Sequence, residues 1–399
     1  MRFDSGLLAH VGDTASFPPV GEWLELSRLL ESCGYTGVWS AEHHFAWDPG
    51  TTPTPTNPLM FAAYVAAQTE RLRIGQCGLL FPSWHPLRAA EDAAMVDHMT
   101  RGRLDFGFMK GLSAKVSRNF DAVGVERDHD KTNAELMWES FEVIRKWWSG
   151  EPFRHDGKYW TFPGEWRAKG TPKELLDPAI YGPDGEMIAL KGIPLPYQQP
   201  IPPCWVMVDS VSSHVQAAQR GVGTLCFANT FEGTREVWTA YRTAANEAAA
   251  AGTLPIGANS RVGMMRPTYV AATQEEADAV MRPALNGLFG GYHGIDAWLG
   301  RRAAVASYEE LTDEDRECDW YDFFQRHDQI FVGTPESVTE KLKRYESELG
   351  AEHLVMYWSM PHISFEQVTD SVKLFADKVM PNFAASDSSS VVELTTVDA

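Results

Sequence analysis

Short apolar runs alternate along this chain with longer segments of helical periodicity, and this alternation constrains the fold more than any other feature. The runs cover residues 2–8, 37–41, 72–77, 103–108, 204–208, 224–227, 262–271 and 353–358. The helical segments cover residues 22–33, 57–69, 87–99, 131–148, 212–220, 234–250, 273–285, 336–348 and 365–379. Such alternation is the signature of parallel βαβ units. Eight strands with interposed helices predict an α/β fold, a (β/α)8 TIM barrel, rather than two doubly wound sheets.

Two stretches interrupt the alternation. Residues 151–203 are rich in Pro, Gly, Trp and Tyr, and predict an insertion between the fourth and fifth strands that could shape a pocket or an oligomer contact. Residues 287–328 follow the seventh strand, where Gly290 and Gly291 could hinge a lid-like segment; an ordinary surface helix pair explains this stretch as well. We therefore expect one barrel domain over residues 1–383 and a disordered Ser-rich tail over residues 384–399.

The charge balance excludes two classes of partner. The 399 residues hold 35 Lys and Arg against 54 Asp and Glu, a formal net charge of −19, which repels nucleic acid and anionic membranes. We find neither a signal peptide nor an apolar run of about 20 residues, so we expect a cytoplasmic protein. The five cysteines form no CxxC pair, which argues against a disulfide framework and a zinc site.

Functional residues of barrel enzymes gather where strands end, so polar residues at those points are candidates. His43 follows the second strand beside Glu42 and His44, a set that suits acid/base chemistry or metal binding, or hydrogen-bonded structural histidines. Adjacent imidazoles on an extended segment point in opposite directions and are unlikely to share one ion. Cys77 and Gly78 follow the third strand, where small residues allow close approach of a flat ligand or a tight packing turn.

The fourth and fifth strands are followed by residues that suit an anion. Met109 and Lys110 lie on a glycine-flanked loop, where a lysine can bind phosphate or carboxylate, or simply be a solvated surface cation. Asp209, Ser210 and Ser213 lie at the start of a helix, where hydroxyls and main-chain N–H groups bind anions or serve as ordinary N-caps. No Rossmann, P-loop, hydrolase-elbow or zincin motif is found.

Taken together and in order, these segments resemble the bacterial luciferase-like flavin monooxygenases, from residue 1 to about residue 381 outside the insertion. The segments that carry the resemblance are MRFDSGLL, GYTGVWSAEHHF, RLRIG, HPLRAAEDAAMVDHMTRGRLDFGF, MKGL, VGVERDHDKTNAELMW, VMVDSVSS, FVGTPESV and VKLFADKVMP. The resemblance implies a (β/α)8 barrel that holds reduced FMN noncovalently at its mouth, where O2 gives a C4a-peroxyflavin that oxidises a second substrate. It also implies a homodimer and a separate NAD(P)H:flavin reductase.

The resemblance assigns roles to individual residues. His43 matches the histidine implicated in acid/base chemistry, and Cys77–Gly78 matches a nonprolyl cis peptide under the flavin ring. Lys110 and Lys131 stand where the family has arginines that contact the FMN phosphate. The matching acidic residue and hydroxyls near the ring edge and phosphate are Asp209, Ser210 and Ser213. Met109 replaces the reactive cysteine of the light-emitting enzymes, and a thioether cannot form a thiolate, so we expect no thiol-dependent behaviour.

Two other functions remain open within the same fold. One is an F420-dependent hydride-transfer oxidoreductase, which needs neither O2 nor a reductase partner. The other is a catalytically silent flavin-binding subunit, against which the retained His43 and phosphate-site residues argue. The aromatic residues of the two interrupting stretches suggest a small apolar or aromatic organic substrate, and packing of the long loops explains them as well.

Overall fold

The computed structural model describes residues 1–7, 20–44, 56–111, 119–120, 129–291, 297–358, 360 and 362–383. The tail predicted over residues 384–399 lies outside this range. No helix within these segments combines the length and the apolar character that a membrane span requires.

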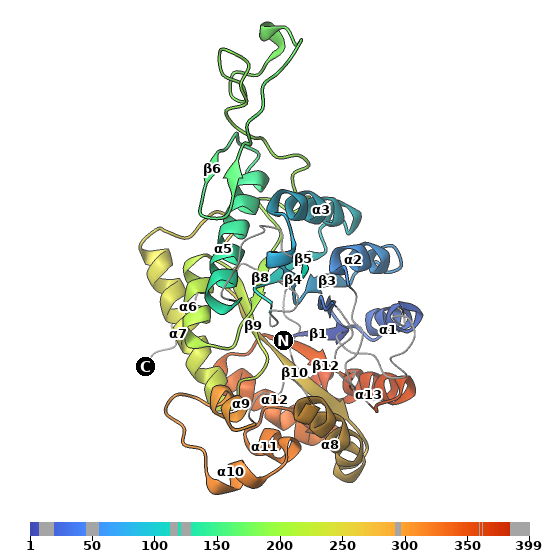
Figure 1. Ribbon diagram of the computed structural model, residues 1–399. Helices are drawn as coiled ribbons and strands as arrows, with labels where there is room; N and C mark the ends of the chain where they lie inside the picture. Colours follow the sequence, from blue (N-terminus) through green and yellow to red (C-terminus); the bar gives the residue numbers. More distant parts are fainter. Residues whose placement is uncertain are drawn as a thin grey trace.

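Eight parallel strands close a barrel, which confirms the predicted fold (Figure 1). They are β1 (Arg2–Leu7), β2 (Gly37–Ser40), β3 (Arg73–Gln76), β5 (Leu104–Met109), β8 (Cys204–Met207), β9 (Gly223–Cys226), β10 (Val262–Val270) and β12 (His353–Tyr357). Each strand pairs with the next in this order, and β12 pairs with β1 to complete the circle. Every boundary lies within one residue of the prediction, because barrel strands are buried on both faces and most of their residues are apolar.

Helices cover the outside of the barrel (Figure 1). They are α1 (Val20–Ser32), α2 (Pro58–Ala66), α3 (Pro86–Met99), α5 (His129–Trp148), α6 (Val211–Gln219), α7 (Phe231–Ala250), α8 (Gln274–Gly291), α12 (Pro335–Leu349) and α13 (Phe365–Lys378). Several begin at a Ser or Thr whose hydroxyl accepts from the main-chain N–H three residues on, as at Thr230, Thr334 and Ser364. These N-caps satisfy donors that a helix start leaves unpaired, and they fix where each helix begins.

Buried charges fill the end of the barrel where the strands begin. The Asp4 carboxylate lies 2.6 Å from the Arg2 guanidinium and 2.9 Å from Nε2 of His353. The Asp105 carboxylate lies 2.8 Å from Arg2 and 2.8 Å from Nε of Arg73. These contacts tie β1, β3, β5 and β12 together. Pairing with an opposite charge makes the burial of these ions tolerable, because an unpaired buried ion destabilises the folded state.

The insertion over residues 151–203 joins α5 to β8, so it is attached at the end of the barrel where the strands begin. It contains the short hairpin of β6 (His155–Asp156) and β7 (Thr161–Phe162), and beyond it the chain runs out past α3 and α5 (Figure 1). The strands end at the opposite side of the barrel. A pocket role and an oligomer contact both stay predictions for this insertion.

The segment predicted as a lid packs against α8. It contains α9 (Ala297–Ala304), α10 (Asp313–Glu317) and α11 (Trp320–Arg326), followed by the short strand β11 (Phe331–Gly333) beside β10. The buried Arg301 side chain donates to the main-chain carbonyls of Arg316 (3.1 Å) and Cys318 (2.6 Å). Arg282 of α8 pairs with Asp319 and Asp322, both at 2.7 Å. Closure of this segment stays a prediction.

Candidate active site

The predicted site residues gather at the ends of neighbouring parallel strands. Those whose side chains are described lie on or just after the ends of β2, β3, β5 and β8: His43, Cys77, Gly78, Met109, Lys110, Asp209, Ser210 and Ser213. Because all these strands run in the same direction, their ends meet at one mouth of the barrel. Lys131 lies in the first turn of α5, and its side chain lies outside the described residues.

Cys77 and Gly78 form a bulge between two strand pairings. The segment β3 pairs Gly75 with Asp105 of β5, and the short β4 (Leu79–Leu80) then pairs Leu79 with Phe108. The chain advances four residues from Gly75 to Leu79 but only three from Asp105 to Phe108, which is the geometry of a β-bulge. The Cys77–Gly78 peptide bond is cis, as the resemblance implies.

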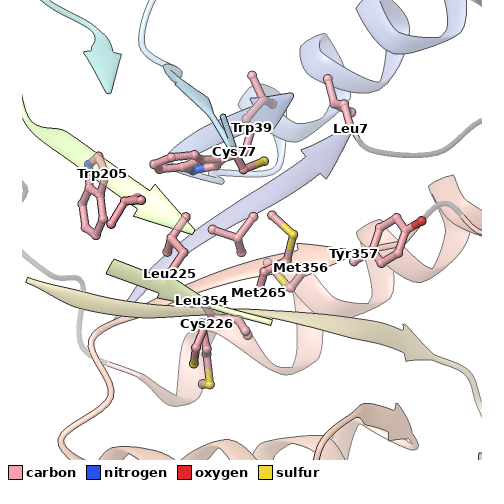
Figure 2. Close-up of a cluster of buried hydrophobic side chains, with 14 of the residues drawn as sticks. Leu7, Trp39, Cys77, Trp205, Leu225, Cys226, Met265, Leu354, Met356 and Tyr357 are labelled. Atoms are coloured by element: carbon pink, nitrogen blue, oxygen red, sulfur yellow. The ribbon is translucent and has the colours of Figure 1, made fainter. Parts of the chain in front are cut away.

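Close packing explains the small residue at Gly78. A Cβ at this position would lie 2.7 Å from the Phe108 nitrogen and 2.8 Å from its Cα. Cys77 belongs to a cluster of buried apolar side chains with Trp39, Leu225 and Met356 (Figure 2). Burial raises the pKa of the Cys77 thiol far above its usual value, so this sulfur stays protonated.

The end of β5 meets the first turn of α5. Met109 and Lys110 are partly buried there, and Nδ2 of the buried Asn133 donates to the Lys110 carbonyl at 3.4 Å. Asn133 lies two residues after Lys131, so this contact brings the backbone of the two predicted phosphate-binding lysines into the same region. A cation held at a barrel mouth suits a phosphate group.

Ser210 and Ser213 lie at the exposed start of α6. Ser210 is the N-cap: its Oγ accepts from the Ser213 N–H at 3.3 Å and donates to the Ser213 hydroxyl at 2.9 Å. Ser212 adds a third exposed hydroxyl 3.3 Å from Ser210. Helix starts combine free N–H donors with the positive end of the helix dipole, so hydroxyls here suit an anion. Capping and anion binding therefore coincide at this position.

The Asp209 carboxylate braces the neighbouring strand end. Its Oδ1 accepts from the main-chain N–H groups of Phe227 (2.6 Å) and Ala228 (3.0 Å), directly after β9. Nδ2 of Asn229 in turn donates a hydrogen bond to the Asp209 carbonyl at 2.9 Å. From the other side, the fully buried Arg266 of β10 donates to the Phe227 carbonyl at 3.0 Å. The loop after β9 is thus clamped from both sides, a role that the sequence did not predict for Asp209.

Glu42 is the residue that organises the segment after β2. Its buried carboxylate accepts from the Leu80 N–H at 2.9 Å and from Nε1 of Trp84 at 3.0 Å. The same carboxylate lies 2.6 Å from Nε2 of His44, whose ring packs 4.4 Å from the Phe120 ring. His43 is partly buried between these two anchored residues. The pair of Glu42 and His44 holds the chain on both sides of the predicted catalytic histidine.

A family model described as luciferase-like monooxygenase matches residues 1–353. The chain belongs to the luciferase-like monooxygenase family. It is 26% identical to the oxygenase component of the flavin-dependent trigonelline monooxygenase of Acinetobacter baylyi, over 92% of this chain and 90% of that protein.

Solved structures agree on the fold. The oxygenating constituent of 3,6-diketocamphane monooxygenase from Pseudomonas putida, in complex with FMN, has a TM-score of 0.70 at 21% identity and covers 96% of this chain and 99% of its own. An F420-dependent tetrahydromethanopterin reductase from Methanopyrus kandleri has a TM-score of 0.65 at 15% identity, over 96% and 99% of the two chains. Identities this low support the barrel fold and leave the cofactor to be decided by the site.

In this luciferase-like monooxygenase, aromatic rings from distant segments meet beside the mouth. Phe227, directly after β9, stacks on Phe289 of α8 at 6.2 Å and lies 6.2 Å from Tyr357 at the end of β12. Phe289 in turn contacts Phe324 (4.7 Å) and Trp320 (5.7 Å) of α11. We call Phe227, Phe289 and Tyr357 the aromatic wall.

The sequence alone missed the aromatic wall, the bracing role of Glu42 and the contribution of Arg266. A charged residue within or just after an apolar run was the available signal for both, since such residues are seldom buried without a specific partner. No local signal could have paired Phe227 with Phe289, because the two are far apart in the sequence and meet only after the barrel closes.

Proposed function

We propose that the chain is the oxygenase component of a two-component flavin-dependent monooxygenase, which uses reduced FMN and O2 to oxidise a small apolar or aromatic organic compound. The observation that carries this proposal is the meeting of a lysine, a hydroxyl-rich helix start and the Cys77–Gly78 bulge at one barrel mouth, in a member of this family. We propose that a separate NAD(P)H:flavin reductase supplies the reduced FMN; the Acinetobacter relative is likewise named as an oxygenase component.

The residues at the mouth suit FMN. Lys110 and Lys131 bring positive charge, and Ser210 and Ser213 bring hydroxyl donors, so together they would hold the phosphate. The isoalloxazine ring would lie over Cys77–Gly78, where the second residue has no side chain. Lysine lacks the planar fork of arginine, so the phosphate is held by point charges rather than by paired parallel bonds.

When bound, reduced FMN supplies the electrons and the reaction with O2. His43 holds and moves a proton on its imidazole during oxygen transfer, and Glu42 with His44 fixes the chain around it. The aromatic wall binds the organic substrate and keeps water away from the reacting atoms.

An anaerobic titration tests the cofactor assignment. The purified chain is titrated with reduced FMN and, separately, with reduced F420, and O2 is then admitted while its consumption is recorded. We expect reduced FMN to bind and O2 to be consumed. Binding of F420 alone, without O2 consumption, would instead establish the hydride-transfer alternative.

The catalytic histidine is tested with the same measurement. A His43→Ala variant should bind reduced FMN like the parent chain and oxidise substrate at least about a hundredfold more slowly, the usual scale of acid/base catalysis. Substrate oxidation at the parent rate would remove His43 from the mechanism. A chain that binds FMN but supports no O2 chemistry, with or without the substitution, would be the silent subunit.

We also propose a homodimer formed through α2 and α3, which pack side by side. Both helices expose large apolar side chains four residues apart: Met60 (71% exposed) with Tyr64 (44%), and Met95 (45%) with Met99 (55%). We call these four residues the α2–α3 face. Sedimentation velocity of a Met60→Glu, Met95→Glu variant should show dissociation, while Ile256→Glu, at an exposed loop position, should leave the parent's state unchanged.

A further inference from the structure

The outer part of the insertion is folded without a core of its own. We call residues 163–188 the arm. None of its apolar side chains is buried against the described part of the chain, and Trp166 and Leu175 are 53% and 75% exposed. Main-chain bonds hold the arm together instead, from the Ala168 N–H to the Gly185 carbonyl (2.8 Å) and from the Met187 N–H to the Trp166 carbonyl (2.9 Å). Ordering a segment costs conformational entropy that apolar burial ordinarily offsets, and the partly buried side chains of the arm give little of this compensation within one chain.

A short basic run lies on the outgoing limb of the arm. Arg167, Lys169 and Lys173 fall between Glu165 and Glu174, and the whole arm holds five carboxylates against these three cations, in a chain whose net charge is −19. In the described structure none of these three cations forms an ion pair with a carboxylate. These three cations can pair with acidic side chains of a second copy of the same protein, whose surface is rich in carboxylates.

The base of the arm lies beside the α2–α3 face. Nε2 of His98 on α3 bonds to the Leu195 carbonyl at 2.9 Å, and Tyr197 packs on the His98 ring at 5.6 Å. His98 directly precedes Met99, an exposed member of that face. From this base the arm projects away from the barrel beyond α3 (Figure 1). In a twofold dimer formed through α2 and α3, an arm rooted here starts at the edge of the interface.

We infer that the arm packs on the surface of the second copy of this chain, as a brace that strengthens the homodimer. Trp166 and Leu175 are its apolar anchors, and Arg167, Lys169 and Lys173 meet acidic groups of that copy. The inference rests on the proposed homodimer and does not depend on the cofactor or the reaction.

Shortening the arm tests the inference on the full-length protein. Arg167 faces Glu186 in an antiparallel bridge, so replacing residues 168–185 by Asn-Gly should close a two-residue hairpin there. We expect sedimentation to show a dimer dissociation constant at least about tenfold higher than that of the parent, with unchanged thermal unfolding of the barrel, since tenfold is about 1.4 kcal/mol of lost contact.

Point variants keep the test valid if the shortened chain folds poorly. Trp166→Ser with Leu175→Ser should weaken the dimer, whereas Ile256→Ser, at a position 83% exposed elsewhere, should not. Reversal of the arm charges by R167E, K169E and K173E should weaken it as well. The matched control is Lys343→Glu, at an exposed position of α12.

Three results separate the possible failures. A parent chain that is monomeric at all concentrations overturns both the homodimer and the arm contact. A dimer that dissociates on substitution of the α2–α3 face, but ignores every change in the arm, overturns the arm contact alone. Weakening by the arm variants and not by their controls supports the inference.

Discussion

At the scale of single residues, the mouth depends on carboxylates that act as braces, one buried and one partly buried. Glu42 joins the segments after β2 and β3, and Asp209 joins those after β8 and β9. Each accepts main-chain N–H groups that would otherwise be buried without partners. Charged acceptors form stronger hydrogen bonds than neutral ones, so a carboxylate suits this task. By holding the main chain, these carboxylates fix the positions of neighbouring side chains whose chemistry differs from their own.

Removing the Glu42 brace should cost stability. Glu42→Ala leaves the Leu80 N–H and the Trp84 indole N–H without their acceptor, so we expect the free energy of unfolding to fall by about 3 kcal/mol in urea titration. Trp84→Phe removes only one of the two donors and should cost about 1 kcal/mol. Equal stability of Glu42→Ala and the parent chain would contradict the role of the brace.

At the scale of elements, each strand end delivers one kind of group to the mouth, and the helix that follows completes it. β5 delivers Lys110, α5 delivers Lys131, and α6 begins with the hydroxyls of Ser210 and Ser213. The proposed cofactor site is therefore shared between elements: β5 and α5 supply the cations, and the start of α6 supplies the hydroxyls.

The phosphate site can be tested by comparing two flavins. Lys110→Gln and Ser213→Ala should each raise the dissociation constant of FMN about tenfold, because the first removes a positive charge beside the phosphate and the second removes a hydroxyl donor to it. Neither should change the affinity for riboflavin, which has no phosphate. Lys343→Gln on the outer face of α12 serves as the control. An equal loss for both flavins would mean that the substitutions disturb the ring site instead.

The aromatic wall belongs to the same scale, since it joins α8 to the ends of β9 and β12. Phe289→Ala should open the mouth to water, so that several times more of the consumed O2 is released as H2O2 while FMN affinity is retained. Peroxide assays on Leu299→Ala, at an exposed position of α9, should match the parent chain. If both variants released peroxide at the parent level, the wall would not shield the reaction.

At the scale of the whole molecule, one end of the barrel is held by buried ions and the other end carries the chemistry. Burial raises the pKa of Asp4, but Arg2 and His353 lower it more, so the pKa of this carboxyl lies well below its usual range. Burial, opposed by Arg2 and Arg73, leaves the Asp105 pKa lowered in the same way. In barrel enzymes this end serves stability, which agrees with its distance from the mouth.

These shifts make stability depend on pH in a defined direction. A carboxyl whose pKa is lowered on folding contributes stability above its unfolded value, about 3.9, and loses it as the pH falls further, by up to about 1.4 kcal/mol per pH unit. Asp4→Asn should therefore be less stable than the parent at pH 7 by about 3 kcal/mol, and the difference should narrow below about pH 4.

The measurement is urea unfolding at a series of pH values. Asp370→Asn, at an exposed position of α13, is the matched control and should follow the parent at every pH. A constant difference between Asp4→Asn and the parent from pH 7 to about pH 3 would show that the ion pairs do not cause the acid sensitivity.

The local sequence was sufficient for the eight barrel strands, the helices between them and the order in which they alternate. Periodicity records which face of each segment is buried, and this information is local, so the eight strand boundaries could be placed within one residue. Parallel direction then assigned His43, Lys110 and Ser210 to a common end, since residues after parallel strands share one side of a sheet.

Tertiary structure alone decided which groups became partners. The Asp209 carboxylate binds the N–H groups after β9, Phe289 stacks on Phe227, and Arg2 lies between Asp4 and Asp105. These contacts depend on strand register and barrel closure, which bring together residues far apart in the chain and leave no periodic trace in it. The sequence thus determined the barrel and the end that carries its site, while the closed barrel determined how each side chain there is held.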